Sequence, residues 1–323
     1  MGHAGELDLH RCIVTGAMTA TETCETQSPG VARVVRQRHL GRWLSGGVMV
    51  VLVALALRSV ATNDRFGWPL VAGYLFDPQI LEGVRLTLVL TFVCMAIGIV
   101  LGTVLAVMRL SANPVAQALA FAYVGFFRGT PVLVQLIFWF NFAALYPHLS
   151  FGIPGVDIDA NALISPVLAG VLGLGLHEAA YMAEIIRGGI GSIDVGQIEA
   201  ARALGLRKNQ VLRRIVLPQA MRVIVPPTGN EVVGMLKTSS LVSVLAVGEL
   251  LYSAQLIYAS NYQTIPLLIV ASLWYLVLTA VLSAGQMRLE RHFARGSVEI
   301  RTAAAEWVRG WLGLGHLARR GVR

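Results

Sequence analysis

The segment from Leu86 to Met108 contains no charged residue and is long enough to cross a lipid bilayer. At 1.5 Å per residue, about 20 apolar residues in a helix span the roughly 30 Å of hydrocarbon. Backbone polar groups in hydrocarbon must be hydrogen-bonded within the protein, so this run predicts a membrane-spanning α-helix. The composition agrees, because 55% of the residues are apolar, 14% are charged and the mean hydropathy is +0.66. These values exclude a soluble domain of this size.

Further apolar segments predict an all-α polytopic membrane protein with about six transmembrane helices. The other five predicted spans are residues 44–61, 131–146, 162–186, 224–257 and 264–284. An amphipathic segment, Pro114 to Phe127, precedes the span at 131–146, so the two form either one bent helix or an interfacial helix and a span. Pro226-Pro227 is expected to interrupt the span that begins at Ile224. A signal peptide is the competing interpretation of residues 44–61, and the long segment before them argues against it.

Basic residues are distributed unevenly between the connections of this arrangement. Arg109 and Arg128 flank one connection, and residues 187–222 hold a further group of basic side chains. The connections on the opposite side carry few, among them Arg58 and Arg65. By the positive-inside rule, both termini and residues 187–222 are expected to be cytoplasmic, which accounts for the net charge of +8 without a nucleic-acid partner. The outer segments are then a cytoplasmic N-terminal segment at 1–43 and a basic cytoplasmic tail at 291–323.

The long cytoplasmic segment predicts two short helices joined by a tight corner. Residues Ile198 to Leu204 favour a helix, Gly205 tolerates the left-handed backbone that often ends one, and Asn209 is a good N-cap for a second. Leu217-Pro218 is expected to end that second helix, because proline cannot donate a backbone hydrogen bond. An apolar stripe along the second helix consists of Val211, Leu212, Ile215 and Val216.

This segment resembles the EAA loop of ABC importer permeases. Glu199-Ala200-Ala201 is followed by Gly205, by Ile215 and by Leu217-Pro218 at the spacing of that motif. The resemblance implies a coupling helix that docks on a separate ATP-binding subunit, with 200–208 as the contact surface. The alternative is an amphipathic connector lying on the bilayer. The residues assigned to coupling are Glu199, Ala200, Ala201, Gly205, Leu206, Arg207, Lys208, Ile215, Leu217 and Pro218.

Three other segments are similar to permeases for histidine, arginine, glutamine or glutamate. They are Phe126 to Pro131, Ala180 to Ile190, and Lys237 to Leu241, where Thr238 replaces the acidic or Asn residue that is common in the group. The resemblance covers roughly residues 80–290, which are expected to form the usual five-helix transmembrane domain with its coupling loop at 187–222. The helix at 44–61 is then an additional one.

The resemblance also implies the partners of the chain. These are two copies of an ABC ATP-binding subunit, a second permease subunit that is either a copy or a paralogue, an extracytoplasmic amino acid binding protein and membrane lipid. The chain itself is expected to be non-catalytic and to bind no cofactor or metal. ATP and Mg²⁺ would be used by the partner ATPase subunit.

Polar side chains within the predicted spans are candidates for the substrate path. They are Gln135, Asn141, Glu178, Glu184 and Lys237. An ionisable group in a span costs roughly 3 kcal/mol, so Glu178, Glu184 and Lys237 each have either a function or a structural partner. For the uncharged Gln135 and Asn141, the alternative is a hydrogen bond to a neighbouring helix. His177, Tyr181 and Glu184 share one helical stripe, where hydrogen bonding to a neighbouring helix is the alternative to a path role. For Glu231 and Lys237, the alternative is that they pair with each other.

The sequence therefore predicts a multi-pass permease subunit of a bacterial inner-membrane, binding-protein-dependent importer of polar amino acids. An ion-coupled secondary amino acid transporter is the alternative, and it would normally show inverted repeats and paired intramembrane charges. A membrane-embedded enzyme would need a nucleophile with its base, or a metal cluster, in or near the bilayer.

Overall fold

The computed structural model describes residues 40–149 and 158–293 of the 323-residue chain. Nearly all regular structure in these residues is helical, which confirms the all-α prediction. The exception is a short antiparallel pairing of β1 (His148–Leu149) with β2 (Ile158–Asp159). The predicted N-terminal segment and basic tail lie mostly outside the described residues.

Four helices are long and apolar enough to cross a bilayer unaided. They are α1 (Leu40–Thr62), α3 (Pro78–Arg109), α8 (Pro166–Gly191) and α13 (Thr264–Phe293). Two bent pairs raise the number of spans in the described residues to six if each pair counts as one. One pair is α4 (Pro114–Gly129) with α5 (Val132–Phe140), bent by 101°, and the other is residues 208–245 with α12 (Leu250–Asn261), bent by 45°. This agrees with the prediction of about six.

The remaining elements are short or belong to the second bent pair. They are η1 (Asp64–Phe66), α2 (Trp68–Tyr74), α6 (Phe142–Leu145), α7 (Ala160–Leu163), α9 (Val195–Ala203), α10 (Lys208–Val211), the π-helical turn η2 (Leu212–Val216), α11 (Leu217–Thr238) and the 3-10 helix η3 (Ser239–Leu245).

Polar caps followed by proline begin several helices. The Asp77 side chain caps α3 by accepting from the Gln79 N–H, and that of Asn113 caps α4 by accepting from the Val115 N–H.

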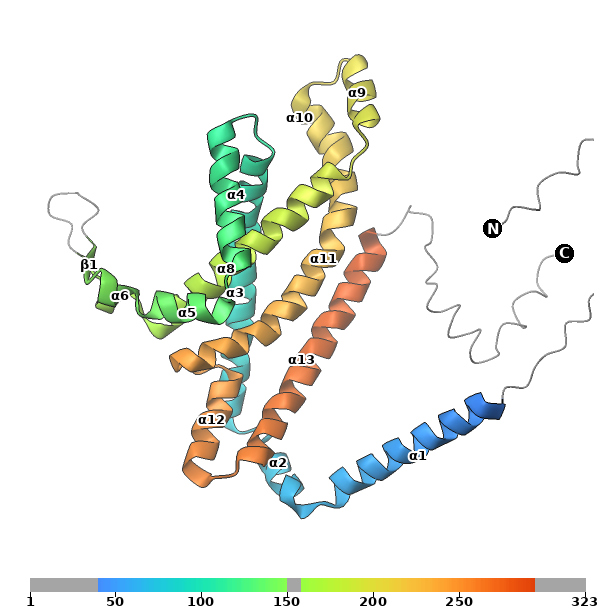
Figure 1. Cartoon of the computed structure of the whole chain (residues 1–323), viewed down its shortest axis with the longest axis vertical. Coiled ribbons are helices and arrows are strands. Elements are labelled where there is room, and N and C mark those ends of the chain that lie inside the picture. The colour runs from blue at the N-terminus through green and yellow to red at the C-terminus, as the bar shows by residue number, and fades with distance from the viewer. Residues whose placement is uncertain (1–39, 150–157, 294–323) are drawn as a thin grey trace, which may run out of the picture. The chain divides into compact units, whose positions relative to one another are not determined.

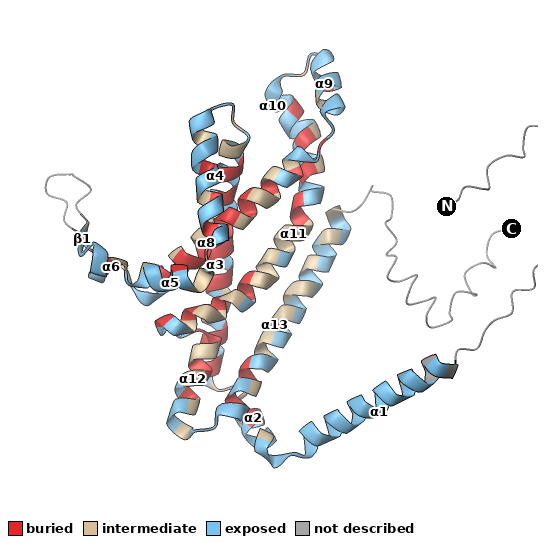
Figure 2. Ribbon diagram, in the orientation of Figure 1, coloured by how far each residue is buried: buried red, intermediate tan, exposed pale blue. Residues whose placement is uncertain are grey.

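Helix α1 belongs to a compact unit of its own, separate from the unit that begins at Asn63. None of its apolar window from Leu44 to Thr62 is buried within the structure, and Figure 2 shows the helix as exposed along its length. A long helix that is apolar on all sides is suited to a lipid environment.

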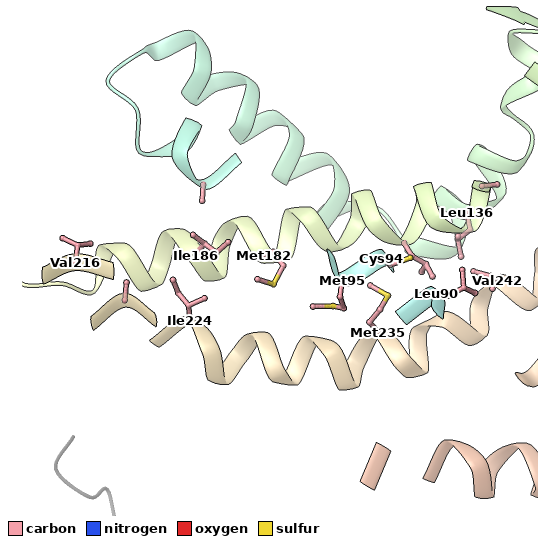
Figure 3. Close-up of a cluster of buried hydrophobic side chains, with 14 of the residues drawn as sticks. Leu90, Cys94, Met95, Leu136, Met182, Ile186, Val216, Ile224, Met235 and Val242 are labelled. Atoms are coloured by element: carbon pink, nitrogen blue, oxygen red, sulfur yellow. The ribbon is translucent and has the colours of Figure 1, made fainter. Parts of the chain in front are cut away.

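In the second unit, α3 and α8 pack closely along their length because small residues separate them. A Cβ atom at Gly102 would lie 2.6 Å from the Met182 Cβ, so only glycine permits this approach. Helix α11 completes the core. Figure 3 shows Met95 from α3, Met182 from α8 and Met235 from α11 among the converging buried side chains.

The connections of the second unit are divided between its two ends (Figure 1). The α3–α4 connection and the α9–α10 corner lie at one end, whereas α2 and the α12–α13 connection lie at the other. Arg109 ends α3 directly before the first of these connections, and Arg207 lies in the α9–α10 corner, so the two residues are at the same end of the unit.

Two sequence predictions about helix breaks are corrected by the structure. Helix α11 continues through Pro226 and Pro227, because the Thr228 hydroxyl donates to the Ile224 carbonyl at 2.8 Å and buried apolar side chains hold both sides of the prolines. The break comes later, after η3, where Ala246 has a φ of 57°. Residues 131–146 do not form one span, because α5 ends at Phe140 and Asn141 separates it from α6. The bent helix pair, one of the two alternatives, is what forms.

Candidate functional site

The corner between α9 and α10 is built by a Schellman motif. Helix α9 reaches its C-cap at Leu204, after which Gly205 has the left-handed φ of 80° that the sequence predicted. The Gly205 N–H donates to the Arg202 carbonyl at 2.9 Å, and the Leu206 N–H donates to the Ala201 carbonyl at 3.2 Å. These two bonds satisfy carbonyls that a helix end otherwise leaves open. The chain therefore reverses within a few residues.

The second helix begins earlier than predicted. Arg207, not Asn209, is its N-cap, and its backbone N–H donates to the Gln210 Oε1 at 2.9 Å. Because the left-handed turn at Gly205 already redirects the chain, helical geometry resumes at Lys208 and Asn209 lies inside α10.

The prediction that Leu217-Pro218 ends this helix is wrong. Helix α10 passes through η2, where the Leu217 N–H donates to the Leu212 carbonyl, and continues into α11 with Pro218 in its first turn. The π-helical turn widens the helix at the point where a regular α-helix would clash with the proline ring.

The coupling residues divide into an anchored set and an exposed set. Ala201 is buried, and the partly buried Leu206 and Ile215 pack against the same core, which includes Val211 and Val216. Leu212 of the predicted apolar stripe is instead 43% exposed. The exposed set comprises Glu199, Ala200, Gly205, Arg207, Lys208, Leu217 and Pro218. Figure 2 shows α9 largely exposed at the tip of the unit.

A hydrogen bond ties the corner to the membrane helix that follows it. The Gln219 Nε2 of α11 donates to the Gln197 Oε1 of α9 at 2.7 Å and to the Ile215 carbonyl at 3.0 Å. Together with the buried Ala201, this contact fixes α9 against the start of α11. The corner is therefore held rigidly while its tip faces outward.

Glu184 of α8 forms an ion pair with α3 near the same end of the unit. Its carboxylate lies 3.1 Å from the Arg109 Nη1 at the end of α3 and 2.7 Å from the Arg187 Nη2 on its own helix α8. The Arg109 guanidinium also lies 5.2 Å from the ring centre of Phe121 on α4. These contacts make Glu184 a link between helices, as the helix-bonding alternative anticipated for this stripe. On the same stripe, the rings of His177 and Tyr181 lie 5.0 Å apart.

The uncharged path candidates are engaged in local contacts. The Gln135 Nε2 donates to the Thr130 Oγ1 at 2.7 Å and to the Phe127 carbonyl at 3.0 Å, which secures the bend between α4 and α5. The Gln135 Oε1 has no hydrogen-bond partner among the described residues. Asn141 donates to the Ile137 carbonyl at 2.8 Å and is exposed. The structure thus gives Gln135 and Asn141 structural contacts at the two ends of α5.

Glu178 stands apart from the other path candidates. It is 4% exposed in the core between α3, α8 and α11, and its Oε1 has no hydrogen-bond partner in the part of the chain that the structure describes. Helix α11 carries another carboxylate, Glu231, which is only partly buried. The predicted pair of Glu231 and Lys237 does not form among the described residues, since Lys237 lies exposed nearly two helical turns farther along α11.

The comparison with protein families identifies the chain. A family model described as the inner membrane component of binding-protein-dependent transport systems matches residues 98–295, which include the whole coupling corner. This chain belongs to that family.

Related transport components cover most of the chain. The arginine transport system permease protein ArgU of Corynebacterium glutamicum is 46% identical over 268 residues, which are 82% of this chain and 84% of that protein. The glutamine transport system permease protein GlnP of Escherichia coli is 33% identical over 224 residues, covering 69% and 94% of the two chains. A solved amino acid ABC transporter with histidines matches with a TM-score of 0.59 at 35% identity, over 67% of this chain and 95% of that one.

The fold alone is shared with a more distant structure. An inward-facing MetNI methionine ABC transporter matches with a TM-score of 0.52 at 22% identity, over 67% of this chain and 97% of that one.

Leu204 lies within the contact surface predicted at 200–208, but sequence reasoning did not single it out. Leu204 is apolar, yet it is 82% exposed at the tip of the corner. It is not one of the fixed positions of the EAA motif. Its place directly before Gly205, where the helix must end, was the available signal.

Proposed function

We propose that this chain is the permease subunit of an ABC importer for polar amino acids, in which the α9–α10 corner docks on a separate ATPase subunit. The observation that carries the proposal is the form of the corner: a rigid Schellman turn with a buried base and an exposed tip, at one end of a membrane domain. Relatives named as arginine and glutamine permeases support a polar amino acid as the transported molecule. An ion-coupled secondary transporter is not favoured, since the relatives are permease subunits.

The proposed contact surface has an apolar centre and a charged rim. Leu204 and Ala200 supply exposed apolar surface, while Glu199, Arg207 and Lys208 surround it with charge. An apolar anchor with a polar rim is the usual composition of a specific protein interface. In this proposal Leu204 enters a groove of the ATPase subunit.

The assembly that follows has four kinds of component. Two ATPase subunits use ATP and Mg²⁺, a second permease subunit completes the membrane domain, and an extracytoplasmic binding protein delivers the amino acid. This chain performs no covalent chemistry and holds no nucleotide itself. Its termini and the corner face the cytoplasm, consistent with the basic residues gathered at that end.

The proposal is tested by ATP hydrolysis of the complex between this chain and its ATPase subunit in lipid nanodiscs, with and without amino-acid-loaded binding protein. We expect the loaded binding protein to stimulate hydrolysis. Gly205→Val should remove most of that stimulation, because a β-branched residue is strongly disfavoured at a φ of 80°. Gly205→Asn is the matched control and should keep stimulation, because asparagine tolerates left-handed backbone.

Three results would count against the proposal. The ATPase subunit does not associate with the chain, the two Gly205 variants behave alike, or transport follows an ion gradient without ATP. The last result would establish the secondary-transporter alternative.

A further inference from the structure

A cavity of about 240 Å³ lies where α4 and α5 meet at their 101° bend (Figure 1). It is lined by Phe126, Phe127, Thr130, Val134, Gln135, Phe138 and Trp139. Phe127 and Gln135 are buried, whereas the side chains of Phe126, Val134 and Phe138 are exposed. The cavity therefore has a buried wall formed by the protein and an exposed apolar rim.

Four of the lining side chains are aromatic and form two edge-to-face pairs. The ring centres of Phe126 and Phe127 on α4 lie 5.2 Å apart, and those of Phe138 and Trp139 on α5 lie 5.8 Å apart. Such rings pack favourably against the face or edge of a further ring. An apolar cavity of about 150 Å³ holds benzene, so this larger one has room for a ring with an alkyl substituent.

The buried wall of the cavity carries one hydrogen-bond acceptor. Gln135 is 5% exposed, and its Nε2 donates to the Thr130 Oγ1 and to the carbonyls of Phe127 and Thr130. The two carbonyls can only accept, which fixes the nitrogen on their side and the oxygen on the other. The Oε1 has no donor among the described residues, and an unpaired buried acceptor is costly.

The lining does not suit an amino acid. None of the described side chains that line the cavity is ionisable, whereas a zwitterion taken out of water needs charged or several polar partners. The α4–α5 pair is one of the candidate membrane spans, so its exposed rim is accessible to molecules dissolved in the bilayer. The occupant that fits is an apolar molecule with one hydrogen-bond donor.

We propose that this cavity binds a lipid-soluble phenol, whose ring packs among the four aromatic side chains and whose hydroxyl donates to the Gln135 Oε1. The site is separate from the coupling corner and from the transported amino acid. A second permease subunit covering this face would exclude the phenol, so the test is made on the assembled complex.

The test is photolabelling of the permease–ATPase complex in nanodiscs. The probes are a 4-alkylphenol with a diazirine in its alkyl chain and the methyl ether of the same molecule, which cannot donate a hydrogen bond. Mass spectrometry gives the labelled fraction of the peptides that contain α4 and α5 at each probe concentration. Peptides from α1, which is exposed along its length, report the unsaturable labelling caused by probe dissolved in the lipid.

We expect saturable labelling at the bend by the phenol. The ether should need at least about ten times the concentration for half-saturation, because it leaves the buried acceptor unpaired. Unlabelled 4-heptylphenol should compete with the probe.

Two pairs of variants control this measurement. Val134→Trp fills the cavity from its exposed rim and should abolish saturable labelling, whereas Val115→Trp, an exposed position of α4 outside the lining, should label as the wild type does. Gln135→Leu should remove the preference for the phenol over the ether. Thr130→Val also loses a bond that secures the bend but leaves the Oε1 in place, so it should keep the preference. Basal ATP hydrolysis of each sample establishes that the complex is folded.

The inference is overturned if the phenol and the ether half-saturate at the same concentration, or if Val134→Trp labels as the wild type does. It is also overturned if labelling at the bend rises without saturation, as at α1, or is absent because a second subunit covers the face. In each of these cases the proposed function stands. If no ATPase subunit associates with the chain, the proposed function fails, and the same labelling of the purified chain decides the inference.

Discussion

At the coupling corner, neighbouring residues set the geometry, whereas the surroundings of Glu178 depend on helices from distant parts of the chain. Gly205 and Arg202 are bonded within one turn, and the tip at Leu204 is 82% exposed. Glu178, by contrast, is 4% exposed and packs against Gly98 of α3. We therefore expect substitutions at the corner to impair function more than stability. Substitutions around Glu178 are expected to lower the stability of the protein.

The largest expected effect is at the contact between α3 and α8. Gly98→Ala should lower the free energy of unfolding by about 2 to 3 kcal/mol, because the new methyl group would overlap the Glu178 side chain. SDS titration of the purified protein in mixed micelles measures this quantity. Gly125→Ala on α4 is the control, since nothing lies within 4 Å of its Cβ position. Equal results for the two variants would refute the close approach.

A loss of about 2 kcal/mol is expected for Glu184→Ala. The change leaves Arg109 and Arg187 without their shared carboxylate in a partly buried site, where charged hydrogen bonds contribute more than on the surface. The same titration gives the value. Glu82→Ala breaks an ion pair whose side chains are 60% and 67% exposed, and should change stability by no more than about 0.5 kcal/mol. A similar loss in both variants would mean that Glu184 does not link the helices.

Gly205→Ala should lower the free energy of unfolding by only about 1 kcal/mol, the cost of left-handed backbone for an ordinary residue. No atom lies within 4 Å of its Cβ position, so packing adds nothing to that cost. If this variant is as unstable as Gly98→Ala, the contrast between the two regions fails. Measuring stimulated ATP hydrolysis alongside would show that the functional loss exceeds the loss of stability.

The smallest expected effect is at the bond between α9 and α11. Gln219→Ala should cost about 1 kcal/mol and Gln197→Ala about half as much, because only Gln219 also donates to the Ile215 carbonyl. Paired SDS titrations would resolve the order of the two variants. If Gln197→Ala costs more than Gln219→Ala, the main stabilising contact lies on α9 and not at the Ile215 carbonyl of η2.

The sequence predicted those features that depend on short-range chemistry. The uncharged run from Leu86 to Met108 lies within α3, and the left-handed turn at Gly205 follows from glycine's freedom at positive φ. Helix breaks were less predictable. Pro226 and Pro227 remain inside α11 because buried side chains and the Thr228 hydroxyl hold the helix together, and Pro218 is accommodated by a π-helical turn.

The candidate path could be predicted only as a set of residue types. Polarity within a span drew attention to Glu178 and Glu184 alike, but only packing shows that Glu184 is paired with two arginines and that Glu178 is not. The sequence also offered a pairing of Glu231 with Lys237, and no such ion pair forms among the described residues.

The uninterrupted helix from Lys208 to Leu245 connects the corner directly to the interior of the membrane domain. At 1.5 Å per residue it is a stiff rod more than about 45 Å long, with one end at the proposed docking tip and the other deep in the membrane domain. Had Pro218 ended the helix, a flexible joint would have absorbed a push on the tip. Because η2 keeps the helix continuous at Pro218, a displacement of the corner is transmitted along α11 into the membrane domain.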